Sequence, residues 1–440
     1  MIRVLLIGKP EWCERMGEDI NSCGTHTVAA VSHTKNIEGM TEDIDLAYVE
    51  AAFGDISSVT IACNNLKIPL QIVPDGVTPR RYVKDERLIQ RLVNTGLIRQ
   101  HKPCSKDEGQ YLVGKRILIT GAGGSIGSDL ARKIAKFSPV HVVLVDNSEN
   151  GVYEVNLEME IDGFTSKTAI VADIRDRHRV RSIMQEYKPD IVFHIAARKH
   201  VPLMERFPEE AVTTNISGTI VTLEEAEKAG VKLFTFISTD KAADPANVMG
   251  ATKRIAERVI QRHAKICSMK HCIVRFENVL DSDGNVVYTF LRQLRRGGNL
   301  TVTSPKMNRY FITREHASTF IIRASGLADC GEVFVPDAGP PINISKLATT
   351  IGGVMGYKEG INYRIIYTQP RPGEKMSEEL VTEEEMKRQK ELDGLFMIPP
   401  VDNHPADFDA NIESIQDAAA KVDRAKMLEL ISKLEPTYKP

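Results

Sequence analysis

The residues best suited to chemistry lie in the Ser-Thr-Asp-Lys segment at 238–241 and at Lys253. Thr239, Asp240 and Lys241 bring together a hydroxyl, a carboxyl group and an ammonium group, and Lys253 adds a second ammonium group. A lysine with a lowered pKa can act as a base, and a partly buried carboxyl group that stays protonated can act as an acid. The pattern therefore indicates acid–base catalysis.

These side chains need an element that positions them, and residues 233–237 (Leu-Phe-Thr-Phe-Ile) have the pattern of a buried strand. In a doubly wound α/β sheet, active groups lie at the carboxyl ends of the strands. Thr239, Asp240 and Lys241 follow such an end directly, and Lys253 falls on the helix predicted to come next.

A glycine-rich turn upstream predicts the cofactor site. Residues 115–120 form a strand pattern, Gly-Ala-Gly-Gly-Ser-Ile-Gly follows at 121–127, and a helical run begins at 128. In this context the glycines let backbone amides meet a pyrophosphate, and the helix N-terminus adds its dipole. The turn residues expected to contact the dinucleotide are Gly121, Gly123, Gly124, Ser125, Ile126 and Gly127.

Asp146 ends the next predicted strand, at 142–145, close to the ~20 residues beyond the glycines expected for a ribose-binding carboxylate. A carboxylate there accepts hydrogen bonds from the adenosine ribose and repels a 2′-phosphate. NAD is therefore favoured over NADP.

Two later strand ends extend the expected cofactor site. Asp173, with Ile174, lies either near the adenine or at the start of a helix, where Asp173 would be the N-cap. Ala196 and Ala197 are small enough to let the chain pass close to the cofactor. His194, just before them, is expected to be a packed, hydrogen-bonded residue and not a catalyst.

The composition limits the classes of protein to which the chain can belong. The chain has 440 residues, 42% hydrophobic and 26% charged, with a net charge of −2, as in an ordinary soluble protein without a basic field for nucleic acid. No apolar run approaches the ~18 residues that span a bilayer. The seven cysteines include no C-x-x-C pair and no Cys/His cluster with zinc spacing, so no metal site is expected. Their odd number and the lack of a secretion signal favour the cytoplasm.

The chain divides by pattern into an α/β protein of several parts. Residues 1–82 predict a degenerate Rossmann-like domain, because its first turn, Gly-Lys-Pro at 8–10, lacks the phosphate-binding glycines. Residues 83–114 predict a helix and a linker, and 115–275 the NAD-binding Rossmann domain. Residues 276–440 contain a smaller mixed α/β subdomain, and the last 60 or so are expected to be mainly amphipathic helix.

Residues 115–440 resemble the extended short-chain dehydrogenase/reductases, and among them the polysaccharide-biosynthesis nucleotide-sugar 4,6-dehydratases of capsule and flagellin glycosylation. Met249 stands where most of these enzymes have a tyrosine, four residues before Lys253. Methionine there is typical of a large membrane-attached branch that acts on UDP-N-acetylglucosamine and has a preceding Rossmann-like domain. The chain looks like that branch without its membrane helices and with a shortened N-terminal domain. The matching segments are 120–128, 199–205, 238–241, 247–254, 274–276, 278–279, 309–311 and 371–375.

The resemblance implies a redox-neutral elimination. NAD+ takes a hydride from C4 of the sugar, the C5 proton and C6 hydroxyl leave as water, and the hydride returns at C6. Lys241 would be the C5 base, Asp240 the acid for the C6 hydroxyl, and Thr239 a hydrogen-bond partner of the C4 hydroxyl. Lys253 would hold the nicotinamide ribose. Because Met249 cannot exchange protons, Asp240, Thr239 or a water would take the C4 hydroxyl proton.

The resemblance also places the substrate, a UDP-sugar bound largely by residues 276–440. Arg309 and Arg371 would lie near the nucleotide diphosphate or base, since guanidinium groups match phosphate oxygens. Asn278, Lys199 and His200 are weaker candidates for sugar or nucleotide contacts. One further residue, Asn215, resembles a helix asparagine near the cofactor or bridges backbone segments.

Three residues depart from the family pattern on the expected substrate side: Glu277 and Asp281 where glycine is usual, and Tyr288 where proline is common. Carboxylates near a diphosphate are unfavourable unless they point away or pair with cations. These departures bear on the sugar and base more than on the reaction.

Other functions remain open. A dehydratase that also inverts C5 shares the chemistry, although such enzymes keep the tyrosine. A nucleotide-sugar 4-epimerase shares fold and cofactor, but it needs no acid for C6. A non-catalytic NAD and nucleotide-sugar-binding protein has no need of an acid–base pair. The superfamily further implies a homo-oligomer, paired through the helices near Lys253 and 211–229.

Overall fold

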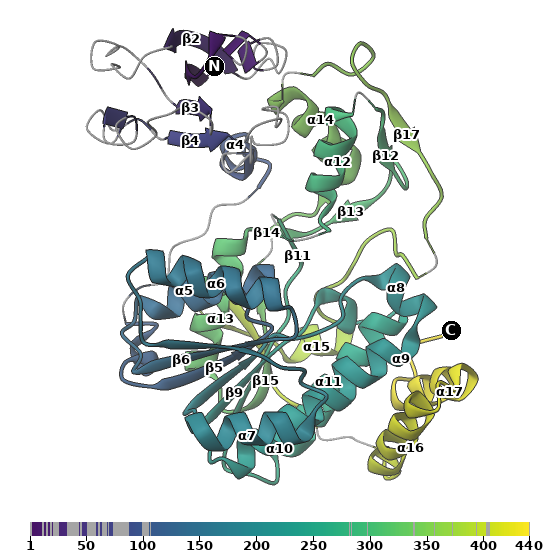
Figure 1. Cartoon of the computed structure of the whole chain (residues 1–440). Helices are drawn as coiled ribbons and strands as arrows, with labels where there is room; N and C mark the ends of the chain where they lie inside the picture. The colour runs from purple at the N-terminus through teal and green to yellow at the C-terminus, as the bar shows by residue number, and fades with distance from the viewer. Residues whose placement is uncertain are drawn as a thin grey trace. The chain divides into compact units, whose positions relative to one another are not determined.

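The computed structural model describes residues 2–10, 26–32, 46–50, 70–73, 88–98 and most of 105–439. It also describes isolated positions between the N-terminal segments, and within 105–439 it leaves out 106, 281, 283, 297, 338, 356, 372, 393 and 402–404. The chain forms two compact units (Figure 1). One comprises Met1–Ile98, Val286–Val302 and Ser345–Tyr367, and the other Arg99–Asn285, Thr303–Ile344 and Thr368–Pro440.

The first unit contains a four-stranded parallel sheet in the order β2-β1-β3-β4. Successive residues of β1 point to opposite faces of this sheet, and both sets are buried. Leu5 and Ile7 pack on one face, and Val4 and Leu6 pack on the other. The elements of this unit are β1 (Ile2–Ile7), β2 (His26–Ser32), β3 (Leu46–Glu50), β4 (Leu70–Val73), α4 (Leu88–Asn94), α12 (Val286–Arg295), β12 (Leu300–Val302), α14 (Ile344–Val354) and β17 (Ile365–Tyr367).

The second unit is built on a nine-stranded sheet in the order β18-β19-β15-β10-β9-β8-β5-β6-β7. Helices α5, α6 and α13 cover one face, and α7, α10 and α11 the other (Figure 1). The strands from β15 to β7 are parallel, which confirms the predicted doubly wound fold. Strand order reverses at β5 and β8, where such sheets bind ligands.

The strands of this sheet are β5 (Arg116–Thr120), β6 (His141–Asp146), β7 (Lys167–Val171), β8 (Ile191–His194), β9 (Leu233–Ile237), β10 (Lys270–Val274), β15 (Cys330–Pro336), β18 (Lys390–Leu392) and β19 (Leu395–Ile398). The flanking helices are α5 (Ser125–Ala135), α6 (Glu149–Ile161), α7 (Arg177–Tyr187), α10 (Thr219–Lys228), α11 (Val248–Ala264) and α13 (Arg314–Leu327). Smaller elements are η1 (Gln110–Leu112), α8 (Val201–Arg206), α9 (Pro208–Ala211), the π-helix η2 (Val212–Gly218), η3 (Asp240–Ala242), β11 (Asn278–Val279), β13 (Asn308–Arg309), β14 (Phe311–Ile312), β16 (Ile342–Asn343), α15 (Glu383–Arg388), α16 (Phe408–Ala420) and α17 (Arg424–Leu434).

The C-terminal segment differs from its prediction as mainly helix. The hairpin β18–β19 adds two antiparallel strands to the sheet, with β19 paired to β15. Leu395 and Ile398 of β19 are buried against the sheet's two faces, so tertiary packing overrides the local charge pattern. Helices α16 and α17 do form, and their apolar residues pack on α11 and η2. In the described part of the chain, no helix is both long and apolar enough to cross a membrane.

A cluster of buried charges joins the sheet to the helices beside it. Arg275, directly after β10, has a side chain with 0% exposure and donates to Glu257 of α11 at 2.6 and 2.7 Å and to Glu385 of α15 at 2.8 and 3.0 Å. Arg254 bridges the same two carboxylates at 3.0 and 2.8 Å. Although burial alone would raise them, Arg275 holds the pKa values of Glu257 and Glu385 below their usual range.

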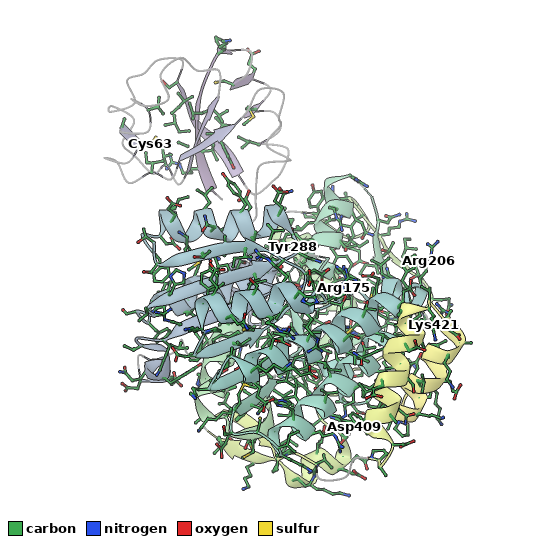
Figure 2. All side chains as sticks on the ribbon, turned by 60° about the horizontal axis from the view of Figure 1, so that its bottom comes forward. Cys63, Arg175, Arg206, Tyr288, Asp409 and Lys421 are labelled. Carbon is green, nitrogen blue, oxygen red and sulfur yellow. The ribbon has the colours of Figure 1, made fainter. Side chains whose placement is uncertain are left out.

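We expect Arg275→Met to lower the free energy of unfolding by about 3–5 kcal/mol, because it leaves two carboxylates buried without their main partner. The measurement is urea unfolding of the full chain. Lys421→Met is the control, because Lys421, labelled in Figure 2, follows the end of α16. Its side chain is 69% exposed and pairs with Asp417 one turn away. Such surface pairs contribute below about 1 kcal/mol. Equal midpoints for the two variants would contradict a stabilising role for the cluster.

Candidate active site

The glycine-rich turn between β5 and α5 leaves no room for side chains. Gly121 has φ 71°, and a Cβ on it would lie 2.6 Å from the backbone of Ala196. A Cβ on Gly123 would lie 2.5 Å from Gly151, and one on Gly127 2.1 Å from the Gly121 carbonyl. The three glycines therefore let the turn pack tightly between α5, α6 and the end of β8.

The start of α5 presents its first turn without a competing carboxylate. Gly124 is the N-cap and provides no side-chain hydrogen bond, and the first turn, beginning with Ser125 and Ile126, contains no acidic residue. Asp146, at the end of β6, accepts hydrogen bonds from the amides of Gly123 and Ser148 at 2.9 and 2.8 Å. These contacts hold its carboxylate beside the glycine turn, where the predicted ribose contact requires it.

One predicted cofactor segment borders the same turn, and another follows β7. Ala196, with Ala197 next to it, follows β8 against Gly121. Asp173 binds Arg175 at 2.7 Å and does not cap a helix at Ile174, since α7 begins at Arg177 and is capped by Asp176. The helix-cap alternative for Asp173 is therefore wrong, because Asp176 is the carboxylate placed to accept the Arg179 amide.

Asn215 bridges backbone segments: its side chain pairs with the amide and carbonyl of Arg198 at 2.8 and 3.1 Å and donates to Thr252. His194 is fully buried and bonded through both nitrogens to Thr120 (2.8 Å) and Thr219 (3.1 Å), which confirms its structural role. Burial lowers the pKa of His194 to about 3, so the ring is neutral.

The three predicted acid–base residues lie in one hydrogen-bonded group at the carboxyl end of β9. The Thr239 hydroxyl donates to Asp240 Oδ1 at 2.7 Å, and Lys241 Nζ donates to the same oxygen at 2.9 Å. Asp240 is buried, and its Oδ2 atom has no hydrogen-bond partner. Asn278 Oδ1 lies 3.5 Å from Lys241 Nζ. The three side chains are therefore linked by hydrogen bonds to one carboxylate oxygen.

Helix α11, which carries Met249 and Lys253, packs closely on the segment that carries Thr239, Asp240 and Lys241. Gly250 approaches so closely that a Cβ there would lie 2.2 Å from the Lys241 carbonyl oxygen. Met249 is buried among apolar residues of α8, η2 and the C-terminal helices. Lys253, one turn further, is buried with its Nζ 3.8 Å from the centre of the Phe236 ring. Burial lowers the pKa of Lys253 to about 7, so its ammonium group loses its proton near neutral pH.

Two glutamates that were not predicted as catalytic or binding residues lie beside the group of Thr239, Asp240 and Lys241. Glu277 is 5% exposed, and neither of its carboxylate oxygens has a hydrogen-bond partner. Burial, with the charges of Asp240 and Asp337, raises its pKa to about 8. Burial also raises the pKa of Glu378, against the opposing charge of Lys241. Glu277 was visible in sequence as a departure from glycine, whereas Glu378 has no local signal.

The predicted substrate residues have different surroundings. Arg309 is buried, and its guanidinium group donates to the carbonyls of Asn308, Lys375 and Met376 at 2.7–3.2 Å. It therefore anchors the segment around Arg371 instead of presenting a free fork to phosphates. Arg371 itself is exposed.

The loop that carries Arg371 docks beside the acid–base group. Asn247 at the N-cap of α11 donates to the Gly373 carbonyl at 3.1 Å, and Lys375 donates to the Asp244 carbonyl at 2.6 Å. Lys199 and His200 are exposed before α8. Tyr288 lies on α12 in the other compact unit, and Asp281 lies outside the described residues.

These residues fit the predicted dinucleotide. The glycine turn, the uncapped start of α5 and the Asp146 carboxylate form the cradle that a pyrophosphate and ribose need. Lys253 is buried with its Nζ atom over the Phe236 ring. The hydroxyls of a bound nicotinamide ribose would be hydrogen-bond acceptors for its ammonium group.

Glu277→Gln tests the buried, protonated carboxyl group. Since burial raises the pKa of Glu277, the native protein holds a proton that the unfolded chain loses above about pH 4.5, and its stability falls as pH rises toward 8. The unfolding free energy of wild type relative to Glu277→Gln should fall by up to about 1.4 kcal/mol per pH unit in that window. Urea unfolding between pH 5 and 8.5 measures it, with the exposed Glu379→Gln as control. A pH-independent difference would show that Glu277 is ionised.

Comparison with known proteins gives the chain its family. The family model described as polysaccharide biosynthesis protein matches residues 117–400. "Probable polysaccharide biosynthesis protein EpsC" of Bacillus subtilis is 43% identical over 292 residues, and "Capsular polysaccharide biosynthesis protein CapD" of Staphylococcus aureus is 44% identical over 294 residues. Each match covers 65% of this chain and 48% of the relative, so the chain spans about half the length of these relatives.

Solved structures agree with this assignment. Pen from Bacillus thuringiensis is 35% identical, with a TM-score of 0.62 over 66% of this chain and 89% of that one. A dTDP-glucose 4,6-dehydratase, DesIV from Streptomyces venezuelae, is 19% identical with a TM-score of 0.54 over 72% and 99% of the two chains, and shows the shared fold. The match over most of the second unit, with the motifs in place around one acid–base group, means that the chain belongs to the polysaccharide biosynthesis protein family.

Proposed function

We propose that the chain is an NAD-dependent nucleotide-sugar 4,6-dehydratase that converts UDP-N-acetylglucosamine to the 4-keto-6-deoxy sugar for surface polysaccharide or glycoprotein synthesis. The observation that carries this proposal is the contact of Asp240 with both Thr239 and Lys241. Elimination needs an acid and a base on adjacent sugar carbons, and this pair offers both within 2.9 Å.

NAD would be held by the glycine turn at 121–127, Asp146 and Lys253, and it would supply a hydride acceptor for C4 and a hydride donor for C6. Thr239 receives the C4 hydroxyl as a hydrogen-bond partner and passes its proton to Asp240, which replaces the missing phenol at Met249. Lys241 removes the C5 proton once the C4 ketone has acidified it, and Asp240 protonates the departing C6 oxygen, which leaves as water. Lys241 then returns a proton to C5 as the hydride adds at C6, so water is eliminated with no net oxidation. Lys253 holds the nicotinamide ribose and stabilises developing alkoxide charge.

Some similar proteins are named for a different reaction. UDP-glucose 4-epimerases of Rickettsia are 31–32% identical to this chain over 291–295 residues. An epimerase needs no acid at C6, so a buried Asp240 bonded to Lys241 favours dehydration. A dehydratase that inverts C5 would use the same groups, whereas a binding protein would need neither.

Incubating the full chain with UDP-N-acetylglucosamine and NAD+ in D2O tests the proposal. We expect a 4-keto-6-deoxy product with deuterium at C5 and no net NADH, and NMR of C5 separates retention from inversion. Lys241→Met should lower the rate by about 10²–10⁴-fold, because it removes the base. Lys270→Met is the matched control, because Lys270 is exposed at the opposite end of β10. A C4 epimer without C5 deuterium would identify an epimerase, and no turnover of UDP-, GDP- or dTDP-hexoses would favour a binding protein.

Met249→Tyr tests the proton relay. If Thr239 and Asp240 already handle the C4 proton, a phenol at 249 should change kcat by less than about tenfold. Met249→Phe supplies the same ring without the hydroxyl in this buried position, and the two variants should be equally active. A large gain in kcat for tyrosine alone, with unchanged KM, would show that the relay is inefficient.

A further inference from the structure

Three side chains suited to metal binding meet at the end of the sheet opposite the acid–base group. His263 lies near the end of α11, Cys267 in the connection after it, and His271 at the start of β10. Their His-x-x-x-Cys-x-x-x-His spacing is not a common zinc pattern, and the sequence predicts no metal here. The helix–turn–strand geometry nevertheless brings their ligand atoms within 4.8 Å of one another.

The distances in this cluster match tetrahedral coordination. His263 Nδ1 lies 3.1 Å from His271 Nε2, and Cys267 Sγ lies 3.3 Å from His263 Nδ1 and 3.9 Å from His271 Nε2. A zinc ion with Zn–N of about 2.1 Å and Zn–S of about 2.3 Å in tetrahedral geometry separates its ligand atoms by about 3.4–3.6 Å. The observed values bracket that range, so the ion fits with shifts of a few tenths of an ångström.

A carboxylate outside the cluster orients one ligand. Glu227 of α10 lies 3.0 Å from His263 Nε2. If Nε2 carries the proton that Glu227 accepts, the Nδ1 lone pair faces Cys267 and His271. A carboxylate behind a ligating histidine is the usual outer partner in zinc sites, where it fixes the tautomer and raises ligand basicity.

The remaining ligands have the character that a metal requires. His271 is fully buried, and burial together with His263 lowers its pKa to about 4, so the ring is neutral at physiological pH. Burial raises the pKa of the Cys267 thiol, so a metal must displace its proton. His263 and Cys267 are partly exposed, which leaves a route for the ion and room for a water as fourth ligand.

We propose that His263, Cys267 and His271 form a zinc site that clamps the end of α11 to the start of β10. One thiolate and two imidazoles are ligands typical of zinc. The site is separate from the acid–base group, because it lies at the amino ends of the strands while that group lies at their carboxyl ends.

The test uses the tag-free full chain, stripped of metal under reducing conditions and titrated with Zn2+ or Co2+. Wild type should bind one zinc per chain at this site, with a rise in Tm. Cobalt should give tetrahedral visible bands and a thiolate-to-cobalt charge-transfer band. Cys267→Ser should abolish that band and weaken zinc binding at least about 100-fold, and Glu227→Gln should weaken it about 10–100-fold.

Two variants separate this site from other thiols and imidazoles. Cys330→Ser and His178→Asn remove exposed side chains outside the cluster and should leave zinc affinity and the cobalt spectrum unchanged. Zinc binding that is equal in wild type and Cys267→Ser, or a cobalt complex without a thiolate band, would overturn the proposal. If Cys267→Ser is poorly folded, the wild-type cobalt spectrum still decides it.

Discussion

The buried arginine at the end of β10 is the constraint on which the second unit depends. Arg275 cannot be solvated, so Glu257 and Glu385 must both be in place, and Arg254 must complete the charge balance. Desolvating these ions is costly unless every partner is present, so β10, α11 and α15 are favoured only as an assembled set. Arg258 and Glu435 extend the pairing to the C-terminal residues at 2.8 Å.

The acid–base group depends on the same cluster. Ser238 donates to Glu257 at 2.6 Å, which fixes the residue just before Thr239. Glu277 follows Arg275 by two residues and is thereby held in the apolar interior beside Asp240. The charge cluster thus positions both strand ends that form the site, while Gly250 sets their distance from α11. Asp240 then binds Lys241 directly, the charge of Lys241 also acts on Glu378, and Glu277 interacts with Asp240.

Sequence alone predicts those features whose causes are local. The glycine turn, the strand before it and the carboxylate at Asp146 belong to one continuous motif that sequence can identify, although the turn also packs on Ala196. The structure contains them as expected. Arg309 illustrates the opposite case. Its predicted place near the nucleotide diphosphate or base stays a prediction, but its guanidinium group binds carbonyls 66 and 67 residues away, which sequence did not indicate. The partner of Arg275 at Glu385 is 110 residues distant, and the hairpin β18–β19 joins the sheet through β15. None of these pairings has a periodic signal.

Helix α11 links these features along one axis. Its first turns carry Met249 and Lys253 beside the acid–base group, Glu257 enters the charge cluster, and His263 lies in the last turn. Seventeen residues at about 1.5 Å each make a rod of about 25 Å, and a helix fixed at its start and middle cannot shift its end independently. The same packing that sets Lys253 against Phe236 therefore also sets His263 against His271. The anchoring of α11 beside the acid–base group therefore also fixes the distant arrangement of His263 and His271.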